Sequence, residues 1–347
     1  MSDLTIPSQA RKVVIIGSGF HRSVLGDLQH PLANWSLLLQ EVARRVGCRL
    51  EPSECKEPTL AWEKVLSQYV RKKRGELSVS EAEKPLKQAV AEVLREATAG
   101  SQAVYRAHAI TRQVEAFLAR GGGHLISLNF DQLCYDGSGG LNNPVNLRKG
   151  AGGVRKPDLR LLHERIVRKA GTSAPSMIWH PHGCIRRFDS IRLGYRDYGL
   201  LPASYLHAFA QFKRWESERT KSPRKSGRQG SKDFRQRLLD ALESLDCGPK
   251  NASDRAADHW VTRFMVLPVQ VIGAGISEHE LGLRWLFVQR QRNFQRHPEN
   301  GPPIFHRELQ PFAGPWMSDV VDHSSWSQAW YTVFGPPAYA ALRRSDK

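Results

Sequence analysis

Apolar residues along the chain follow two periods, one typical of buried strands and one typical of amphipathic helices. The β-branched run at 13–16 ends in glycine, which predicts a buried strand that leads into a tight turn. Similar runs predict strands at 124–128, 176–180 and 264–272. Pro268 interrupts the last of these and indicates an edge strand or a bulge.

Helical spacing of apolar residues accounts for most of the remaining pattern. It predicts helices over 34–46, 57–73, 102–119, 157–169, 202–217, 233–245 and 278–294, and another whose first position is Pro85. The stretch 136–153, rich in glycine, is expected to be a long loop. Strands that alternate with helices predict an α/β fold: a Rossmann-like parallel sheet flanked by helices, with a helical insertion or small helical subdomain and no zinc ribbon.

The same pattern suggests one main domain over residues 1–300, with helical insertions at about 57–120 and 202–250. The segment 219–232 contains no apolar residue and six Lys or Arg, which predicts a flexible basic loop. Residues 301–347, rich in Trp and Pro, are expected to form an irregular C-terminal cap or interaction segment.

Composition narrows the function classes. The 347 residues carry 51 Lys and Arg against 34 Asp and Glu, a net charge of +17 that favours polyanions such as nucleic acid or phosphorylated small molecules. No apolar run approaches the roughly 18 residues that cross a bilayer, and the first one is too short for a secretory signal. The five cysteines are scattered without a CxxC pair, which argues against a zinc ribbon. We therefore expect a cytoplasmic protein with no membrane association.

Polar turns follow the four predicted strands, at 17–23, 129–131, 182–183 and 273–277. Ligands of parallel α/β sheets bind beyond the carboxyl ends of the strands, so these turns should converge if the sheet is continuous. The Gly-x-Gly of residues 17–19 suits either a phosphate or an ordinary strand-to-helix turn.

Three of these turns contain side chains that suit more than one role. Asn129 and Asp131 could orient a water, a sugar hydroxyl or a carboxamide, or could form an Asx turn. His182 of the His-x-His sequence is a candidate general base, although a structural histidine is the alternative and a metal site lacks further ligands. Ser277 suits a helix N-cap or a ligand contact.

The order of these motifs resembles that of the sirtuin-like family of NAD-consuming domains. The similar segments are Gly17-Ser18-Gly19 with Trp35-Ser36-Leu37-Leu38, the strand 125–131 ending in Asn-x-Asp, Trp179-His180-Pro181-His182-Gly183, and Gly273-Ala274-Gly275-Ile276-Ser277-Glu278 with Glu280, Leu283 and Trp285. Together they span roughly residues 12–290, so the main domain over residues 1–300 would be the NAD-binding catalytic domain.

The resemblance implies a role for each matching position. Asn129 would position a ribose hydroxyl or the water, Asp131 would hold the nicotinamide carboxamide, and His182 would act as base toward a ribose hydroxyl. The implied NAD-binding residues are Gly17, Ser18, Gly19, Phe20, His21, Gly183, Gly273, Gly275 and Ser277, with Gly273 and Ser277 on the adenosine side. No metal is implied.

Departures from the family pattern point to one branch of it. Sirtuin deacylases carry two Cys pairs that bind zinc, and this sequence has no such pairs. Leu128 stands where the family usually has a glutamine before the Asn, and His21 stands at a family serine position. The chain is therefore more similar to the bacterial branch that hydrolyses NAD+ to nicotinamide and ADP-ribose in anti-phage defence, a form of abortive infection.

That branch implies activation by oligomerisation or by a defence partner such as a DNA-translocating ATPase or a short Argonaute. The basic surface adds direct or indirect contact with nucleic acid as an expectation. Two alternatives stay open: a sirtuin-type deacylase or ADP-ribosyltransferase, and a basic nucleic-acid-associated subunit whose nucleotide fold is structural or regulatory.

Overall fold

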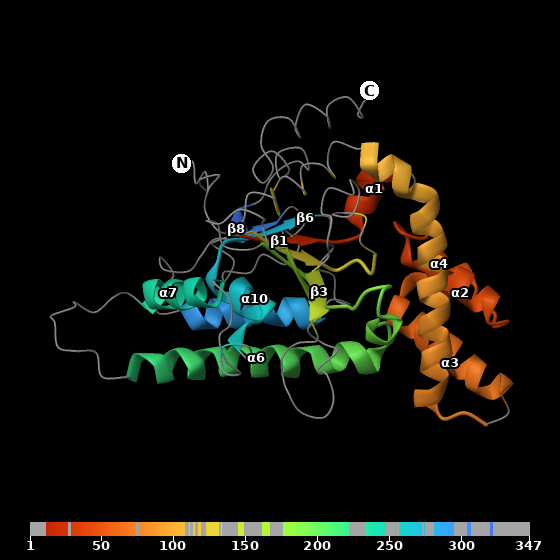
Figure 1. The fold of residues 1–347 in the computed structure, drawn as a ribbon. Helices are drawn as coiled ribbons and strands as arrows, with labels where there is room; N and C mark the ends of the chain where they lie inside the picture. Colours follow the sequence, from red (N-terminus) through yellow and green to blue (C-terminus); the bar gives the residue numbers. More distant parts are fainter. Residues whose placement is uncertain are drawn as a thin grey trace.

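The computed structural model of the chain gives a mixed α/β fold (Figure 1). The residues that it describes are 12–26, 29–73, 76–107, 111, 114, 117–118, 123–131, 133, 145–148, 162–166, 176–221, 234–246, 254, 257–272, 274, 281–294, 304–306 and 320–321. Within them, no helix is both long enough and apolar enough to cross a bilayer.

The described strands form one eight-stranded sheet in the order β3-β4-β5-β2-β1-β6-β7-β8. Their bounds are β1 Val13–Ile16, β2 His124–Ser127, β3 Val145–Arg148, β4 Leu162–Ile166, β5 Ser176–His180, β6 Val269–Ile272, β7 Ile304–His306 and β8 Val320–Val321. From β5 to β8 every pair is parallel, whereas β4 pairs antiparallel with both β5 and β3. The α/β class with a parallel sheet is thus confirmed for the centre, and the sheet as a whole is mixed.

Strand β1 explains why the sheet is covered on both faces. All four of its side chains are inaccessible to solvent, and successive side chains of a strand point to opposite faces. Val14 and Ile16 join the apolar cluster formed with the N-terminal helices, whereas Val13 and Ile15 join the cluster formed with the later helices. A strand that is apolar at every position is typical of a sheet buried between two helical layers.

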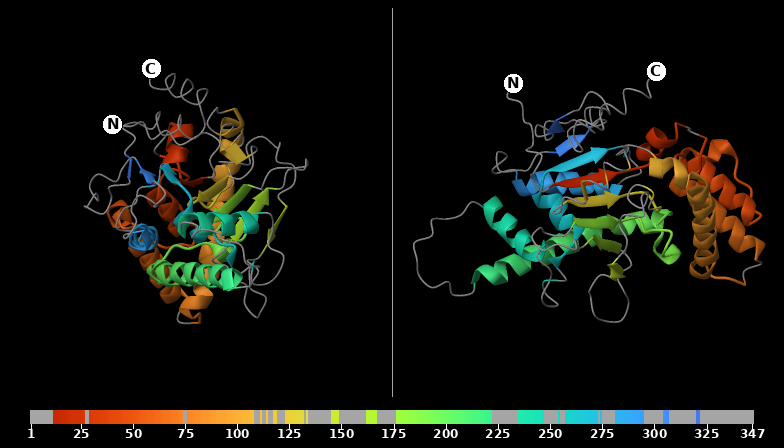
Figure 2. Two further views of the ribbon diagram at one scale, coloured as in Figure 1. Left: turned by 90° about the vertical axis from the view of Figure 1, so that its left-hand side faces the viewer. Right: turned by 45° about the horizontal axis from the view of Figure 1, so that its top comes forward.

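The N-terminal group of helices consists of α1 Gly19–Leu25, α2 Trp35–Arg45, α3 Pro58–Lys72 and α4 Val79–Ala107. Helices α2, α3 and α4 pack together as a helical lobe (Figure 1), and the arrowheads of the central strands point toward it (Figure 2). Asn34 caps α2 by accepting a hydrogen bond from the Ser36 N–H at 3.0 Å. Helices α2 and α3 confirm the predictions for 34–46 and 57–73.

The second group of helices consists of α6 Tyr195–Lys221, α7 Phe234–Asp246, α9 Trp260–Val266 and α10 Leu281–Phe294. Aromatic contacts join these helices. The rings of Tyr205 and Trp260 lie 4.9 Å apart, and those of Phe264 and Phe287 lie 5.2 Å apart, both edge to face. Helix α7 confirms the helix predicted over 233–245.

The prediction of a helix over 157–169 is wrong, because strand β4 occupies residues 162–166. This stretch is short, and periodicity alone does not separate a short strand from a helical turn. Pairing with β5 over five residue pairs decides the outcome. The loop expected over 136–153 likewise contains strand β3, and the rest of that stretch lies outside the described residues.

The prediction that a helix begins at Pro85 is also wrong, because α4 begins two turns earlier, at Val79, and contains Pro85. The start is set by a capping box: Glu81 accepts a hydrogen bond from the Ser78 N–H at 2.8 Å, and the Glu81 N–H donates to the Ser78 hydroxyl at 3.3 Å. The helix then continues to Ala107, so residues 102–107, expected to open a separate helix, belong to α4.

Three further expectations change. The strand predicted over 264–272 is two elements, α9 and then β6, and β6 is an interior strand rather than an edge. Pro268 precedes β6 and accepts a hydrogen bond from the Val13 N–H at 2.8 Å, so its missing N–H interrupts no pairing.

Residues 219–221 of the expected basic loop belong to α6, and 222–232 lie outside the described residues. Strands β7 and β8 occupy parts of the segment expected to be irregular.

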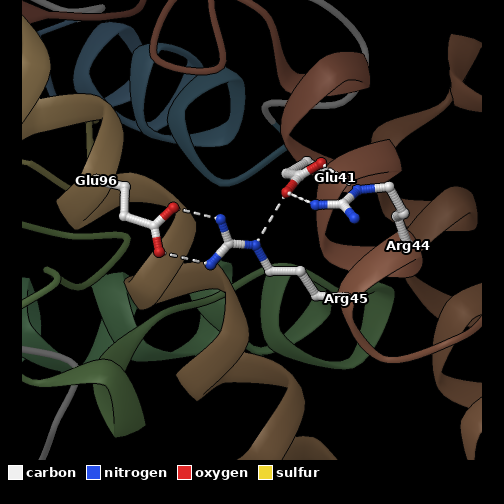
Figure 3. Close-up of polar contacts among 4 residues, drawn as sticks. All are labelled: Glu41, Arg44, Arg45 and Glu96. Carbon is white, nitrogen blue, oxygen red and sulfur yellow. Dashed lines mark hydrogen bonds and ion pairs between the residues drawn. The ribbon is translucent and has the colours of Figure 1, made fainter.

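A charged cluster joins α2 to α4 at the surface of the helical lobe (Figure 3). Arg45 makes a bidentate contact with Glu96, one arm of which is 2.9 Å long, and its Nε donates to Glu41 at 3.0 Å. Among the described residues, Arg44 pairs with Glu41 on its own helix and with no residue of α4. The hydrogen bond from Arg44, opposed by burial and aided by Arg45, lowers the pKa of Glu41 to about 2.

We expect Arg45→Met to lower the free energy of unfolding by no more than about 1 kcal/mol, because the cluster is partly exposed and screened by solvent. Arg44→Met is the matched control and should have a smaller effect, since Arg44 does not bridge two helices. Urea unfolding at low ionic strength measures both. Equal losses in the two variants would contradict the bridging role of Arg45.

Candidate active site at the carboxyl ends of the strands

Three of the four polar turns meet at one edge of the sheet. Strands β5, β2, β1 and β6 are adjacent and parallel, so their carboxyl ends face the same way. The Asn129 amide donates to the Gly17 carbonyl at 3.1 Å, which joins the turns after β1 and β2. The Ile185 N–H donates to the Phe130 carbonyl at 2.8 Å, which joins the turns after β2 and β5. The convergence expected from the sequence is therefore confirmed for these three turns.

The fourth turn follows β6 in the sequence. Its predicted ligand residues Gly273, Gly275 and Ser277 lie outside the described residues. Their roles remain expectations.

The glycine turn after β1 is tight and leads directly into α1. The Phe20 N–H donates to the Gly17 carbonyl at 3.0 Å, and Phe20 is fully buried beneath the turn. Ser18 is half-buried and Gly19 is the first residue of α1. The left-handed glycines of the described chain are Gly26, Gly47 and Gly183, so Gly17 and Gly19 are not required there by a positive φ.

His21, predicted as an NAD-binding residue, lies against Asp131, predicted as a catalytic one. The distance from His21 Nε2 to Asp131 Oδ2 is 2.9 Å, and His21 Nδ1 lies 2.6 Å from the Tyr105 hydroxyl. All three residues are buried. Tyr105 belongs to α4, so this contact connects the helical lobe to two of the converging turns.

Both carboxylate oxygens of Asp131 are engaged. Oδ1 accepts a hydrogen bond from the Leu133 N–H at 2.9 Å, which is the Asx turn that the sequence allowed. Burial alone would raise the pKa of Asp131, but attraction and hydrogen bonding from His21, with backbone N–H groups, outweigh burial and lower that pKa. Asp131 is therefore an ionised group that positions both its own turn and His21.

Aromatic packing supports the Asn129 turn. The Trp35 ring, at the start of α2, contacts the Phe130 ring edge to face at 5.1 Å. Asn129 is 8% exposed, so its amide lies in a nearly dry environment where hydrogen bonds are strong and directional. Trp35, part of the motif resemblance, therefore packs against the residue that follows Asn129.

His182 is buried at the end of β5, and its environment favours the neutral imidazole. Burial, and then the positive charge of Arg192, lower the pKa of His182 from 6.5 to about 3, although a hydrogen bond to the Leu128 backbone opposes this shift. Its ring lies 5.2 Å from that of Tyr198. Because Leu128 precedes Asn129, the candidate base and the candidate amide lie beside each other.

The residue after His182 is Gly183, and the backbone geometry at this position requires glycine. Its φ is +88°, and a Cβ built there would lie 2.1 Å from the Ser190 carbonyl oxygen. Ser190 also accepts a hydrogen bond from the Cys184 N–H at 3.1 Å, which folds the loop back on the turn. The loop can adopt this shape only with glycine at this position.

Sequence reasoning did not identify Tyr105, Arg192 or Tyr198. Tyr105 has the spacing of an ordinary core residue on an amphipathic helix, and 84 residues separate it from His21. A contact over that separation leaves no local signal in one sequence. His180, the other histidine of the His-x-His pair, is fully buried in β5. In the described part of the chain, no three His, Cys, Asp or Glu side chains gather as metal ligands.

Comparisons with known proteins assign no family. No protein-family model matches the chain, and no curated protein or solved structure is significantly similar to it. The functional assignment therefore depends on the geometry of this site.

We expect Gly183→Ala to destabilise the protein by about 1–3 kcal/mol from the left-handed backbone alone, with a further cost from the clash with Ser190. Gly199→Ala is the matched control, because Gly199 lies within α6 with no atom near its Cβ position, and alanine favours a helix. Thermal and urea unfolding measure the two variants. A Gly183→Ala protein as stable as the control would contradict the assigned geometry.

The pKa of His182 predicts a pH dependence of stability. Below pH 6.5 the unfolded chain binds a proton at this histidine, whereas the folded protein does not until about pH 3. Stability should therefore fall with decreasing pH, by about 1.4 kcal/mol per pH unit from this group. His182→Gln should remove this component, so the slope of unfolding free energy between pH 6 and 4 should be shallower in the variant. Parallel slopes would show that His182 is not held neutral.

Proposed function

We propose that the chain is an NAD+ glycohydrolase of sirtuin-like, Rossmann-like architecture that cleaves NAD+ to nicotinamide and ADP-ribose. The observation that carries this proposal is the direct contact between the glycine turn, Asn129 and the His182 turn at the carboxyl ends of three adjacent parallel strands. This edge is where ligands bind in α/β sheets of this kind.

The reaction breaks the bond between C1′ of the ribose and the pyridinium nitrogen of nicotinamide. The bonding electrons move to that nitrogen, which loses its positive charge, so the leaving group needs no proton. Water adds to the oxocarbenium-like sugar, and one proton is released overall. The protein therefore has to position the sugar and the water and to stabilise a developing positive charge.

Asn129 suits the positioning role. Its amide nitrogen is held by the Gly17 carbonyl, which orients the side chain before substrate arrives. Preorganised dipoles of this kind need no reorganisation at the moment of reaction. We assign Asn129 to the ribose hydroxyl or the attacking water.

His182 suits the base toward a ribose hydroxyl because its pKa of about 3 leaves the imidazole neutral and able to accept a proton. A pKa this low makes it a weak base in the ligand-free protein. A ribose hydroxyl beside the developing cation has a lowered pKa of its own, which reduces the mismatch. A carboxylate has four lone-pair sites, so a role of Asp131 toward the carboxamide is compatible with its contacts to His21 and Leu133.

For the biological setting we propose NAD+ depletion in anti-phage defence. The support is the motif resemblance and the surplus of basic residues, 51 against 34 acidic, which exceeds what one dinucleotide needs. Activation by oligomerisation or by a nucleic-acid-handling partner follows from the same resemblance. The chain would act in the cytoplasm, where the NAD+ pool lies.

We expect the purified chain to release nicotinamide from NAD+, and both Asn129→Ala and His182→Ala to reduce the rate at least about 100-fold, as for loss of a positioned polar or base group. Chromatography of nicotinamide and ADP-ribose measures the rate across a series of protein concentrations, since assembly would activate the chain. His207→Ala, at an exposed position of α6, is the control and should leave the rate unchanged.

Circular dichroism of each variant separates lost chemistry from lost folding. Unchanged nicotinamide release in both site variants would overturn the site assignment. A wild-type protein that neither binds nor cleaves NAD+ at any concentration would overturn the proposed function.

A further inference from the structure

A continuous polar chain links the helical lobe to the candidate active site. Tyr105 of α4 contacts His21 Nδ1 through its hydroxyl at 2.6 Å, and His21 Nε2 contacts Asp131 at 2.9 Å. The two ring nitrogens of His21 therefore lie against different partners, Nε2 against the Asp131 carboxylate and Nδ1 against the Tyr105 hydroxyl. Tyr105 and His21 are fully buried and Asp131 is 2% exposed, so water does not replace a lost contact.

Packing holds the His21 ring in this orientation. Its centroid lies 5.7 Å from that of Tyr105 and 5.6 Å from that of Phe20, and Phe20 in turn lies 6.0 Å from Tyr105. Three mutually packed rings leave little rotational freedom. The hydroxyl of Tyr105 is the polar group by which α4 contacts this ring.

Helix α4 also holds the other side of the site. Arg95 donates from Nη2 to the Ile185 carbonyl at 2.9 Å, within the loop that follows His182. Ile185 itself donates to Phe130, between Asn129 and Asp131. One helix of the lobe therefore contacts both the glycine turn and the His-Gly turn, at positions ten residues apart on α4.

We propose that Tyr105 is a positioning residue of the NAD+ site, which fixes the His21 ring against Asp131 and so makes substrate binding depend on the packing of α4. This inference rests on the proposed function. Tyr105 acts on Asp131 through His21. Movement of α4, for example on binding a partner at the helical lobe, would then loosen or tighten Asp131.

The expected effect is on binding rather than on the chemical step. A contact between Asp131 and the carboxamide is the same in bound NAD+ and in the transition state, since the carboxamide does not react. Loosening such a contact weakens ground state and transition state equally, which raises KM and leaves kcat unchanged.

The test is Tyr105→Phe, which removes the hydroxyl and keeps the ring that packs on Phe20 and His21. We expect KM for NAD+ to rise about 3- to 10-fold, the effect of one buried hydrogen bond, with kcat within about twofold. Tyr205→Phe is the matched control: Tyr205 is equally a buried tyrosine, but it packs on Trp260 in the other core. Unchanged KM in Tyr105→Phe, or an equal rise in Tyr205→Phe, would overturn the positioning role.

A second measurement needs no substrate. The ¹⁵N resonances of the His21 imidazole in ligand-free protein report the hydrogen bond at Nδ1, and they should shift in Tyr105→Phe and not in Tyr205→Phe. Unshifted resonances would overturn the link itself. If the wild type releases no nicotinamide, the proposed function fails and the role in NAD+ binding fails with it, while the imidazole signal still decides whether Tyr105 orients His21.

Discussion

Strand β1 is the constraint on which the rest of this structure depends. Four residues without a polar side chain are paired on both edges and covered on both faces. Its alternate side chains belong to different apolar clusters, so β1 contributes to both cores of the molecule from opposite faces. Because β1 sits between β2 and β6, the turn that follows it is central among the converging turns. A shift of β1 by one residue would exchange the two faces and displace the glycine turn together.

Elements with a complete local signal were predictable from the sequence. The apolar run of β1 is followed at once by Gly17, and α2 and α3 each carry apolar residues at helical spacing. β4 did not, because the pairing that makes 162–166 a strand is supplied by β5. For α4 the capping box at Ser78 and Glu81 was present in the sequence, yet Pro85 suggested a later start. A proline in a helix costs stability, but the apolar residues that this 29-residue helix buries in one core cluster offset that cost through packing.

The candidate site also has a part that the sequence predicts and a part that it does not. Gly17, Asn129 and His182 each follow a strand, so topology alone brings them to one edge once the strands are parallel neighbours. The partners that set their chemistry come from elsewhere: Tyr105 from α4 and Arg192 from the loop after β5. A residue type at a strand end can thus be predicted as a candidate, whereas its pKa and its hydrogen bonds depend on contacts between distant segments.

Burial of charge does not by itself mark the functional site. Asp258 and Arg263 form a second buried pair, 2.5 Å apart, and the Arg263 guanidinium lies over the Trp179 ring at 5.7 Å. That pair is local to α9: Arg263 lies in the helix, and Asp258 precedes its N-cap residue His259. The pair of His21 and Asp131 differs because it joins two of those turns and is completed from the helical lobe. Removing charges from water costs several kcal/mol, and an apolar core of equal volume is often as stable. The position of the pair, rather than its energy, therefore makes it relevant to function: it lies where a ligand of this sheet would bind, and a single helix holds it in place.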